Sequence, residues 1–225
     1  MMAVPPADGT LTGEAPPLVF RTAHSRAIWA IGFLVISIAV TILTLTVVSD
    51  YFYLRVGSES GDGLVLGGSI LQLIAGAGCV ITFLRWFSRA YRQLPALGAQ
   101  ELQFTSRSAV GWWFVPIAFL WVPLRIAIEL WKGSDPSPAA NDGVSRRAVS
   151  TPILLGVWWG TWLLALFLDN FWAAPQRVAL QGQDLTLAIA ASGFMDIAAA
   201  GMAIAVIAQI DLRQTSRRAR QTEGQ

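Results

Sequence analysis

The stretch "GWWFVPIAFLWVP", residues 111–123, decides the topology that the sequence predicts. It contains no charged residue, three tryptophans (Trp112, Trp113 and Trp121) and two prolines (Pro116 and Pro123). Its uncharged run ends at Arg125 after 14 residues, whereas a spanning helix needs about 20. Each proline removes a backbone donor, and tryptophan favours the headgroup level of a membrane. The stretch therefore predicts an interfacial or re-entrant segment rather than a crossing.

The composition around this stretch is that of a membrane protein. Hydrophobic residues make up 54% of the 225 residues, charged residues only 13%, and the mean hydropathy is +0.53. Those values are too apolar for a soluble domain of this size. The apolar segments are continuous instead of alternating, which disfavours a β-barrel. We therefore predict an all-α integral membrane protein.

Four segments have the length and apolarity of spanning helices, and short polar connections join them into two hairpins. The predicted membrane domain covers 25–212, with spans at about 27–49, 64–84, 152–168 and 185–210. Between the hairpins we expect a Trp/Pro-rich helix over 111–131 and a polar linker over 133–150. The remaining residues form a disordered tail over 1–24 and a basic tail over 213–225, both predicted to be cytoplasmic.

The distribution of Lys and Arg sets the predicted orientation, because cytoplasmic flanks carry the excess of these residues. If the Trp/Pro stretch does not cross, 14 of the 16 basic residues lie inside, and only Arg55 and Arg177 lie outside. If the stretch does cross, the split becomes 7 inside to 8 outside, with Arg125 in the membrane. The first topology has two in–out–in hairpins and both termini in the cytoplasm, and the charge count favours it.

Residues 83–131, "FLRWFSRAYRQLPALGAQELQFTSRSAVGWWFVPIAFLWVPLRIAIELW", resemble the signature of the family catalogued as domain of unknown function 4328. The blocks "RAYRQLPALGA" (89–99) and "GWWFVPIAFLWVP" (111–123) carry the resemblance, which extends over about residues 25–212. Phe119 stands where that family usually has a polar residue, and Val122 where it usually has a basic one. The resemblance implies a bacterial multi-pass membrane protein and no particular chemistry. The predicted location is therefore the bacterial inner (cell) membrane.

The second and fourth spans end in similar basic segments, "LRWFSRAYRQ" (84–93) and "LRQTSRRARQ" (212–221). Each places arginines at i, i+4 and i+7, which form one stripe on a continued helix. We expect these two stripes to contact anionic lipid headgroups. The stripes consist of Arg85, Arg89 and Arg92, and of Arg213, Arg217 and Arg220.

Asp196 is the leading candidate for a functional residue, because it lies inside the apolar run "LTLAIAASGFMDIAAAGMAIAVIAQI" (185–210). A carboxylate near mid-bilayer costs roughly 2.5–3.5 kcal/mol on insertion scales, so something must offset that cost. Gln72 in the second span is at a suitable depth to be a partner. Two interpretations stay open, namely a protonation or ion-coupling site and hydrogen-bonded contact between helices.

Arg125 and Glu129 follow the Trp/Pro stretch at i, i+4 spacing. We expect them to form a solvated pair on the wet face of an interfacial helix, with a gating or headgroup role as the alternative.

The sequence offers little that could support catalysis. A single histidine, His24, and a single cysteine, Cys79, cannot form a metal cluster or a Cys/His dyad. We therefore expect no enzyme activity, no catalytic residue, no metal and no cofactor. Nucleic acid is not an expected partner, because no aromatic platform or known fold accompanies the basic residues.

The predicted function is that of a non-enzymatic membrane component acting through packing, lipid or partner contacts. The alternative is a small transporter or channel subunit with Asp196 in an aqueous or proton path. Because four helices enclose little space, transport would require a homo-oligomer. Whether the protein binds a small molecule is not readable from the sequence.

Overall fold

The computed structural model describes residues 23–54, 59–137, 143–172 and 183–223. Every regular element in these ranges is helical, and none is a strand. The chain therefore belongs to the all-α class that its composition predicts.

Four long helices confirm the four predicted spans. They are α1 (His24–Leu54), α2 (Glu59–Arg92), α6 (Ile153–Phe167) and α8 (Gln183–Glu223), and a π-helical turn, Leu168–Trp172, extends α6. Each contains a segment long and apolar enough to cross a membrane: His24–Val47, Leu66–Arg92, Ile153–Asn170 and Ile189–Glu223. The structure thus extends the second and fourth helices well beyond the predicted limits of 84 and 210.

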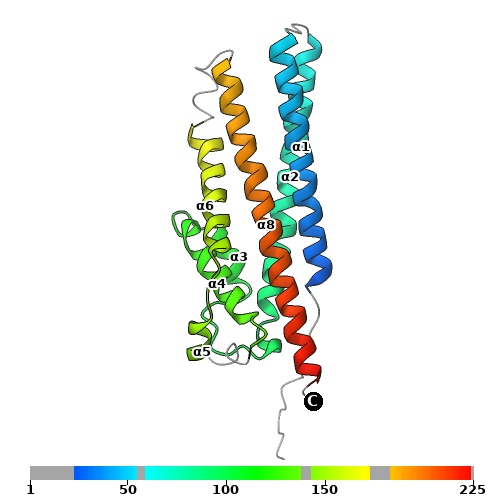
Figure 1. The fold of residues 1–225 in the computed structure, drawn as a ribbon. Coiled ribbons are helices and arrows are strands. Elements are labelled where there is room, and N and C mark those ends of the chain that lie inside the picture. Colours follow the sequence, from blue (N-terminus) through cyan, green and yellow to red (C-terminus); the bar gives the residue numbers. More distant parts are fainter. Residues whose placement is uncertain (1–22, 55–58, 138–142, 173–182, 224–225) are drawn as a thin grey trace, which may run out of the picture.

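The long helices form an elongated bundle in the order α6, α8, α1, α2 (Figure 1). α1 packs against both α2 and α8, and α6 packs against α8. The end of α1 and the start of α2 lie at one end of the bundle, together with the start of α8. The end of α8 lies at the opposite end, which also contains α4 (Val122–Gly133) and α5 (Gly143–Ala148). We call this second end the α4 end.

Glycines on α2 and α8 allow each of these helices to approach α1 closely. A Cβ atom on Gly78 would lie 2.3 Å from the ring of Phe33, and one on Gly193 would lie 2.9 Å from the side chain of Leu45. No side chain larger than hydrogen fits at such distances unless its neighbour moves. Small residues at helix contacts are the usual means of packing in membranes, where lipid is as apolar as a leucine side chain.

The stretch 111–131 is not the single helix that the sequence predicts. α3 (Ser108–Gly111) leads into a 3₁₀ turn, Trp112–Phe114, and a second 3₁₀ turn, Ala118–Leu120, precedes α4. The break has a local cause, because Pro116 has no N–H to donate. Pro123, in contrast, occupies the first turn of α4, where a missing N–H costs nothing.

Ile117 makes the sharpest turn in this stretch. Its φ is 67° and its ψ is −54°, and the amide of Ala118 donates to the carbonyl of Pro116 at 2.7 Å. This is a γ-turn with positive φ, a strained conformation that a β-branched residue rarely adopts. Such backbone strain costs of the order of 1–3 kcal/mol and persists only where the surrounding structure enforces it.

The predicted tails and linker fall partly outside the described residues. Residues 1–22, which make up most of the predicted N-terminal tail, are outside them, as are 138–142 of the linker. The rest of the linker contains α5. The predicted basic tail over 213–225 is helical through Glu223, since α8 continues without a break beyond Ile210.

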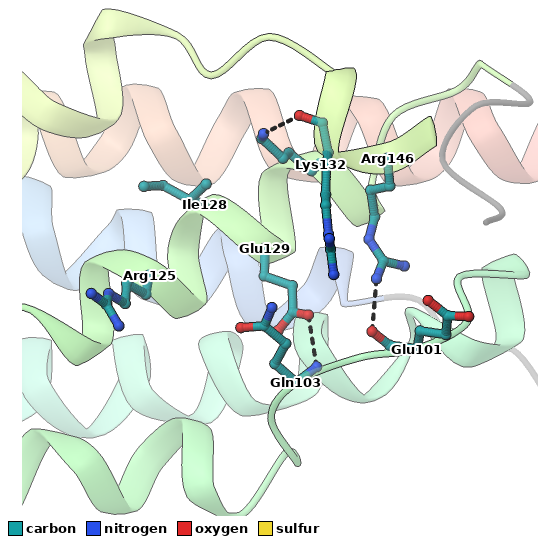
Figure 2. Close-up of a pocket in the computed structure, with 8 residues that line it drawn as sticks. Glu101, Gln103, Arg125, Ile128, Glu129, Lys132 and Arg146 are labelled. Atoms are coloured by element: carbon teal, nitrogen blue, oxygen red, sulfur yellow. Dashed lines mark hydrogen bonds between the residues drawn. The ribbon is translucent and has the colours of Figure 1, made fainter. Parts of the chain in front are cut away.

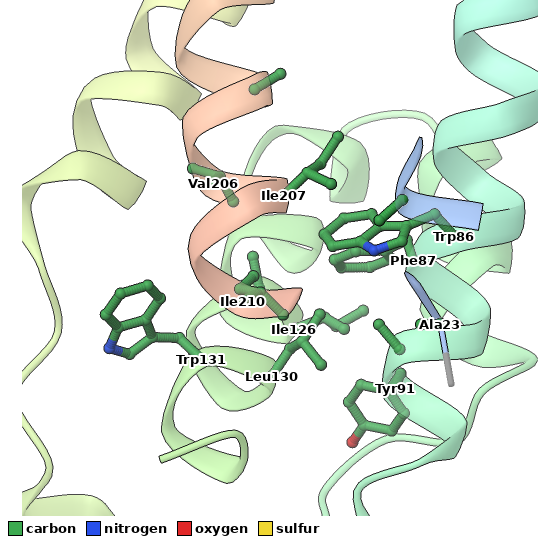
Figure 3. Packing of buried hydrophobic residues seen from close by; sticks show 14 of the residues in the cluster. Ala23, Trp86, Phe87, Tyr91, Ile126, Leu130, Trp131, Val206, Ile207 and Ile210 are labelled. Atoms are coloured by element: carbon green, nitrogen blue, oxygen red, sulfur yellow. The ribbon is translucent and has the colours of Figure 1, made fainter. Parts of the chain in front are cut away.

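The hydrophobic core is concentrated toward the α4 end of the bundle (Figure 3). There the last turns of α2 meet α4 and the later half of α8. The largest fully buried side chains in this region include Trp86, Phe87, Tyr91, Ile126, Leu130 and Ile207. On α4 the buried positions 123, 126, 127, 130 and 131 form one apolar stripe. This half of the molecule is therefore packed in the manner of a soluble domain.

Candidate functional site

A cavity of about 690 Å³ opens between the helices in the other half of the bundle. Its walls come from the second half of α1, the first half of α2, the π-helical turn after α6 and the early part of α8. Asp196 and Gln72, the two residues of the predicted intramembrane site, both line it. The structure therefore brings these two residues to the wall of one cavity.

Hydrogen bonds tie the polar groups of this cavity to neighbouring helices. Gln72 Nε2 donates to Thr41 Oγ1 at 3.1 Å, which links α2 to α1. The hydroxyl of Ser192 donates to the carboxylate of Asp169, which links α8 to the π-helical turn. Gln72 Oε1 is buried and has no hydrogen-bond partner among the residues that the structure describes. An unpaired buried amide oxygen is an exception among buried polar groups.

Asp196 and Gln72 lie at the same level of the bundle. Asp196 precedes Asp211 by 15 residues, or about 22 Å along α8. Gln72 precedes Arg85 by 13 residues, or about 20 Å along α2. Asp211 and Arg85 are the charged residues at which the two apolar runs end. Both distances exceed half the thickness of an apolar layer of about 30 Å. The cavity therefore lies in the half of the layer that is farther from Asp211 and Arg85.

The cavity combines an apolar lining with two carboxylates. Asp169 and Asp196 are its acidic residues, and none of its described lining residues is basic. Thr41, Gln72 and Ser192 add neutral polar groups. This combination is suited to a ligand that carries positive charge on an apolar body.

The aromatic residues of the Trp/Pro stretch contact the apolar helices directly. The ring of Trp113 lies 5.4 Å from Phe83 on α2 and 5.5–5.6 Å from Trp159 and Trp162 on α6, centroid to centroid. Trp159 Nε1 donates to the carbonyl of Leu120 at 2.9 Å. The stretch is thus held against the sides of α2 and α6.

The remaining residues predicted for this motif fall into two environments. Trp112 is half-buried, whereas Pro116 and Trp121 are exposed. Pro123 is buried in the first turn of α4.

Arg125 and Glu129 do not form the predicted pair, because Glu129 has other partners. Its carboxylate accepts hydrogen bonds from Tyr91 Oη at 2.6 Å and from the backbone N–H of Gln103 at 2.8 Å. Tyr91 lies in the last turn of α2, and Gln103 lies in the loop that follows that helix. Both Arg125 and Glu129 line a second, smaller cavity at the α4 end (Figure 2).

The two predicted arginine stripes have different environments. On α2, Arg85 and Arg92 are exposed, and Arg89 is half-buried. On α8, Arg213 pairs with Asp135 and stacks 4.1 Å from the centroid of Trp131. Arg217 is 3% exposed and donates to the carbonyls of Gly133 and Asp135.

In the predicted α8 stripe, Arg220 is exposed, whereas Arg213 and Arg217 bind oxygen atoms of the protein itself. They satisfy backbone and carboxylate oxygens at the end of α4, where helix carbonyls lack partners. The three arginines of α8 therefore do not form a continuous stripe that faces lipid headgroups.

Asp135 is the acidic partner at this junction. Burial raises the pKa of its carboxyl, but hydrogen bonds from Ser137 and the charge of Arg213 outweigh that effect, so that the pKa lies below its ordinary value. The carboxylate therefore contributes stability above the unfolded pKa, about 3.9. That contribution is lost as the pH falls through the lowered folded pKa.

Sequence reasoning missed several residues that shape the two cavities. Asp169 follows the third span directly, and its place in "DNFW" (169–172) was the available signal. Ser192 lies one helical turn before Asp196, on the same face. Tyr91 and Arg146 carried no signal, because their roles depend on the loop that packs between α2 and α4. Within the described ranges, no three His, Cys, Asp or Glu side chains are placed to hold a metal ion.

Together, four long apolar helices and a cavity among them that contains two carboxylates define a multi-pass helical protein suited to a membrane. The chain belongs to the family described as "Domain of unknown function (DUF4328)", whose profile matches residues 56–212. This membership confirms the resemblance seen in the sequence, although the match begins later than residue 25. No curated protein and no solved structure matches the chain.

Proposed function

We propose that this chain is a non-enzymatic protein of the bacterial inner membrane that binds a cationic ligand between its helices. The two carboxylates in the wall of the larger cavity, Asp169 and Asp196, carry this proposal. The cavity has room for a drug-sized molecule, since ligand pockets measure about 300–1,000 Å³. Its ligand is a lipophilic cation or an amine-bearing amphiphile, since such molecules match both the apolar walls and the negative charge.

The proposed topology has two in–out–in hairpins, α1–α2 and α6–α8, with both termini in the cytoplasm. The α4 end is then the cytoplasmic end. This orientation leaves only Arg55 and Arg177, of 16 basic residues, on the outer side, in accordance with the positive-inside rule. The larger cavity then lies in the outer half of the membrane, where a ligand from outside can enter.

The Trp/Pro stretch is a re-entrant segment in this topology. Trp113 contacts Trp162, which lies nine residues beyond Ile153 at the start of α6. Nine residues correspond to about 13 Å of helix, or nearly half of the hydrocarbon thickness. Irregular backbone at this depth needs protein cover, and α2 and α6 supply it.

Cysteine labelling tests the orientation. In a Cys79→Ala background, Ser216→Cys is expected to react with a membrane-impermeant maleimide in inside-out vesicles only, because α8 ends on the cytoplasmic side. Gly63→Cys is the matched control at the other end of the bundle, because a Cβ there meets no neighbouring atom. It is expected to react in right-side-out vesicles. Reaction of Ser216→Cys in right-side-out vesicles would refute the proposed topology.

Binding of a lipophilic cation tests the function. Tetraphenylphosphonium is expected to raise the unfolding temperature of the purified full-length protein in lipid nanodiscs, because a ligand that binds only the folded state stabilises it. The double substitution Asp169→Asn/Asp196→Asn keeps the shape of the cavity and is expected to abolish this rise. Triphenylphosphine oxide, a neutral compound of similar shape, serves as the control ligand. An equal rise with the neutral compound, or with the double variant, would contradict a cation site.

Transport is the second candidate function, favoured by the depth of Asp196. The half of the bundle that contains Trp86, Phe87 and Ile207 is closed by packed side chains, so transport would need a second conformation. Infrared spectra of the carboxyl band separate the two candidates. A carboxyl band that titrates reversibly and disappears in Asp196→Asn supports a proton path. A band that shows no titration leaves binding as the function.

A further inference from the structure

The smaller cavity, at the α4 end, has a volume of about 310 Å³ and a polar, charged wall (Figure 2). At about 30 Å³ per water molecule, it has room for roughly ten waters, or for a phosphate group with the atoms attached to it. Four cationic side chains line it, namely Arg125, Lys132, Arg146 and Arg147. The two carboxylates are those of Glu101 and Glu129. The wall therefore carries an excess of positive charge.

Arg146 and Lys132 are held in place by hydrogen bonds that use only some of their N–H donors. Arg146 is 6% exposed and donates to the carbonyls of Gln100 and Glu101, at 2.5 and 2.9 Å. These bonds use two of the five donors of a guanidinium group. Lys132 Nζ uses one of its three donors on the carbonyl of Arg147, at 2.9 Å. The cavity is therefore built before any ligand arrives, which lowers the entropy cost of binding.

The two acidic groups offset only part of the positive charge of this wall. Glu129 is held by Tyr91 Oη and by the amide of Gln103. Within the described parts of the chain, neither Arg125 nor Arg147 has a carboxylate within ion-pair distance. Arginine presents a planar array of donors suited to phosphate oxygens, so these two side chains are available to an anion.

The cavity lies where the chain enters its apolar layer. Arg147 precedes Ile153, the first residue of α6, which is 84% exposed. Trp121, one helical turn before Arg125, is also exposed and is of the residue type that prefers the headgroup level. A phosphate at this level belongs most simply to a lipid.

From these observations we propose that the smaller cavity binds a phosphate-bearing group, supplied by the headgroup of an anionic lipid or by a soluble phosphate compound. This site replaces the α8 stripe as the main anion contact, since Arg213 and Arg217 are used within the protein. It is independent of the proposed cation site, which lies in the other half of the bundle.

Lipid retention in native mass spectra of the detergent-purified full-length protein tests this site. Short-chain phosphatidylglycerol is expected to bind more tightly than short-chain phosphatidylcholine. The substitution pair Arg125→Gln/Lys132→Gln is expected to weaken binding of phosphatidylglycerol about 30-fold. That factor corresponds to about 2 kcal/mol at 1.4 kcal/mol per tenfold, the contribution expected of two cations near an anionic headgroup.

The pair Arg85→Gln/Arg92→Gln is the matched control, because it removes the same charge from exposed positions on α2 outside the cavity. It is expected to change the affinity less than threefold. An equal loss in both pairs would indicate general attraction to the basic surface and would overturn the proposal. If the double variant does not fold, Arg125→Gln alone replaces it in the test. This single substitution is expected to leave folding intact, because the Arg125 side chain makes no hydrogen bond within the described structure. A loss of about fivefold is then expected, and an unchanged affinity would overturn the proposal.

Competition distinguishes the two sources of phosphate. If inorganic pyrophosphate displaces the lipid at low millimolar concentration, a soluble phosphate compound is the ligand. If it does not, and phosphatidylglycerol still binds, the ligand is the lipid headgroup. Both results support a phosphate site. Binding of an acidic peptide without binding of either phosphate probe would instead identify a protein-interaction surface and overturn the proposal.

Discussion

Replacing Trp159 by alanine is expected to lower the free energy of unfolding by roughly 3–5 kcal/mol, the range found for large aromatic residues in protein cores. Trp159 is 3% exposed and packs against Trp113, Trp158 and Trp162. Its Nε1 also satisfies the carbonyl of Leu120. The substitution therefore removes ring contacts and leaves a carbonyl without a partner in the Trp/Pro stretch.

Denaturant unfolding of the detergent-purified protein measures this effect. Trp29→Ala is the matched control, because that tryptophan on α1 is 66% exposed and is expected to change stability by less than about 1 kcal/mol. Trp159→Phe is expected to fall between the two, because it keeps a six-membered ring but loses the hydrogen bond and the contacts of the second indole ring. If Trp159→Ala were as stable as Trp29→Ala, the Trp/Pro stretch would not be anchored to α6 as described.

Arg217→Gln is expected to destabilise the protein by roughly 3 kcal/mol, since a hydrogen bond to a charged group contributes about 1.5–3 kcal/mol and Arg217 donates to the carbonyls of both Gly133 and Asp135. Its guanidinium group holds the end of α4 through the carbonyls of Gly133 and Asp135. Arg220→Gln is expected to have almost no effect, since Arg220 is exposed three residues further along α8. The two substitutions change the net charge equally.

Thermal unfolding in detergent, followed by circular dichroism, compares these two variants. A larger loss for Arg217→Gln would assign this arginine to the junction between α4 and α8. Equal and small losses would favour the stripe predicted from the sequence, in which all three arginines face headgroups.

The sequence was sufficient to predict the four long helices, because a membrane crossing depends mainly on length and apolarity. It also predicted that the Trp/Pro stretch would not form an ordinary spanning helix, because Pro116 and Pro123 have local effects on the backbone. The γ-turn at Ile117 was not predictable. A β-branched residue disfavours positive φ, so only the contacts of the folded chain can impose it.

The candidate site was predictable in part, for a similar reason. Asp196 and Gln72 were recognisable as polar residues inside apolar runs, where they need an explanation. Their shared cavity depends on how far apart the helices stand, which no local pattern encodes. The spacing of Arg213 and Arg217 correctly placed them on nearby faces of α8. It did not reveal that the end of α4 covers that face.

The uneven filling of the bundle has a consequence for the surrounding lipid. The Trp/Pro stretch packs beside α2 and α6 in the half that also contains the core, whereas the other half encloses a cavity among four helices. The cross-section of the molecule therefore differs between the two leaflets of a bilayer that contains it. One leaflet must give up more area than the other for each copy inserted. Accumulated copies would place the leaflets under unequal lateral tension, which a bilayer relieves by bending.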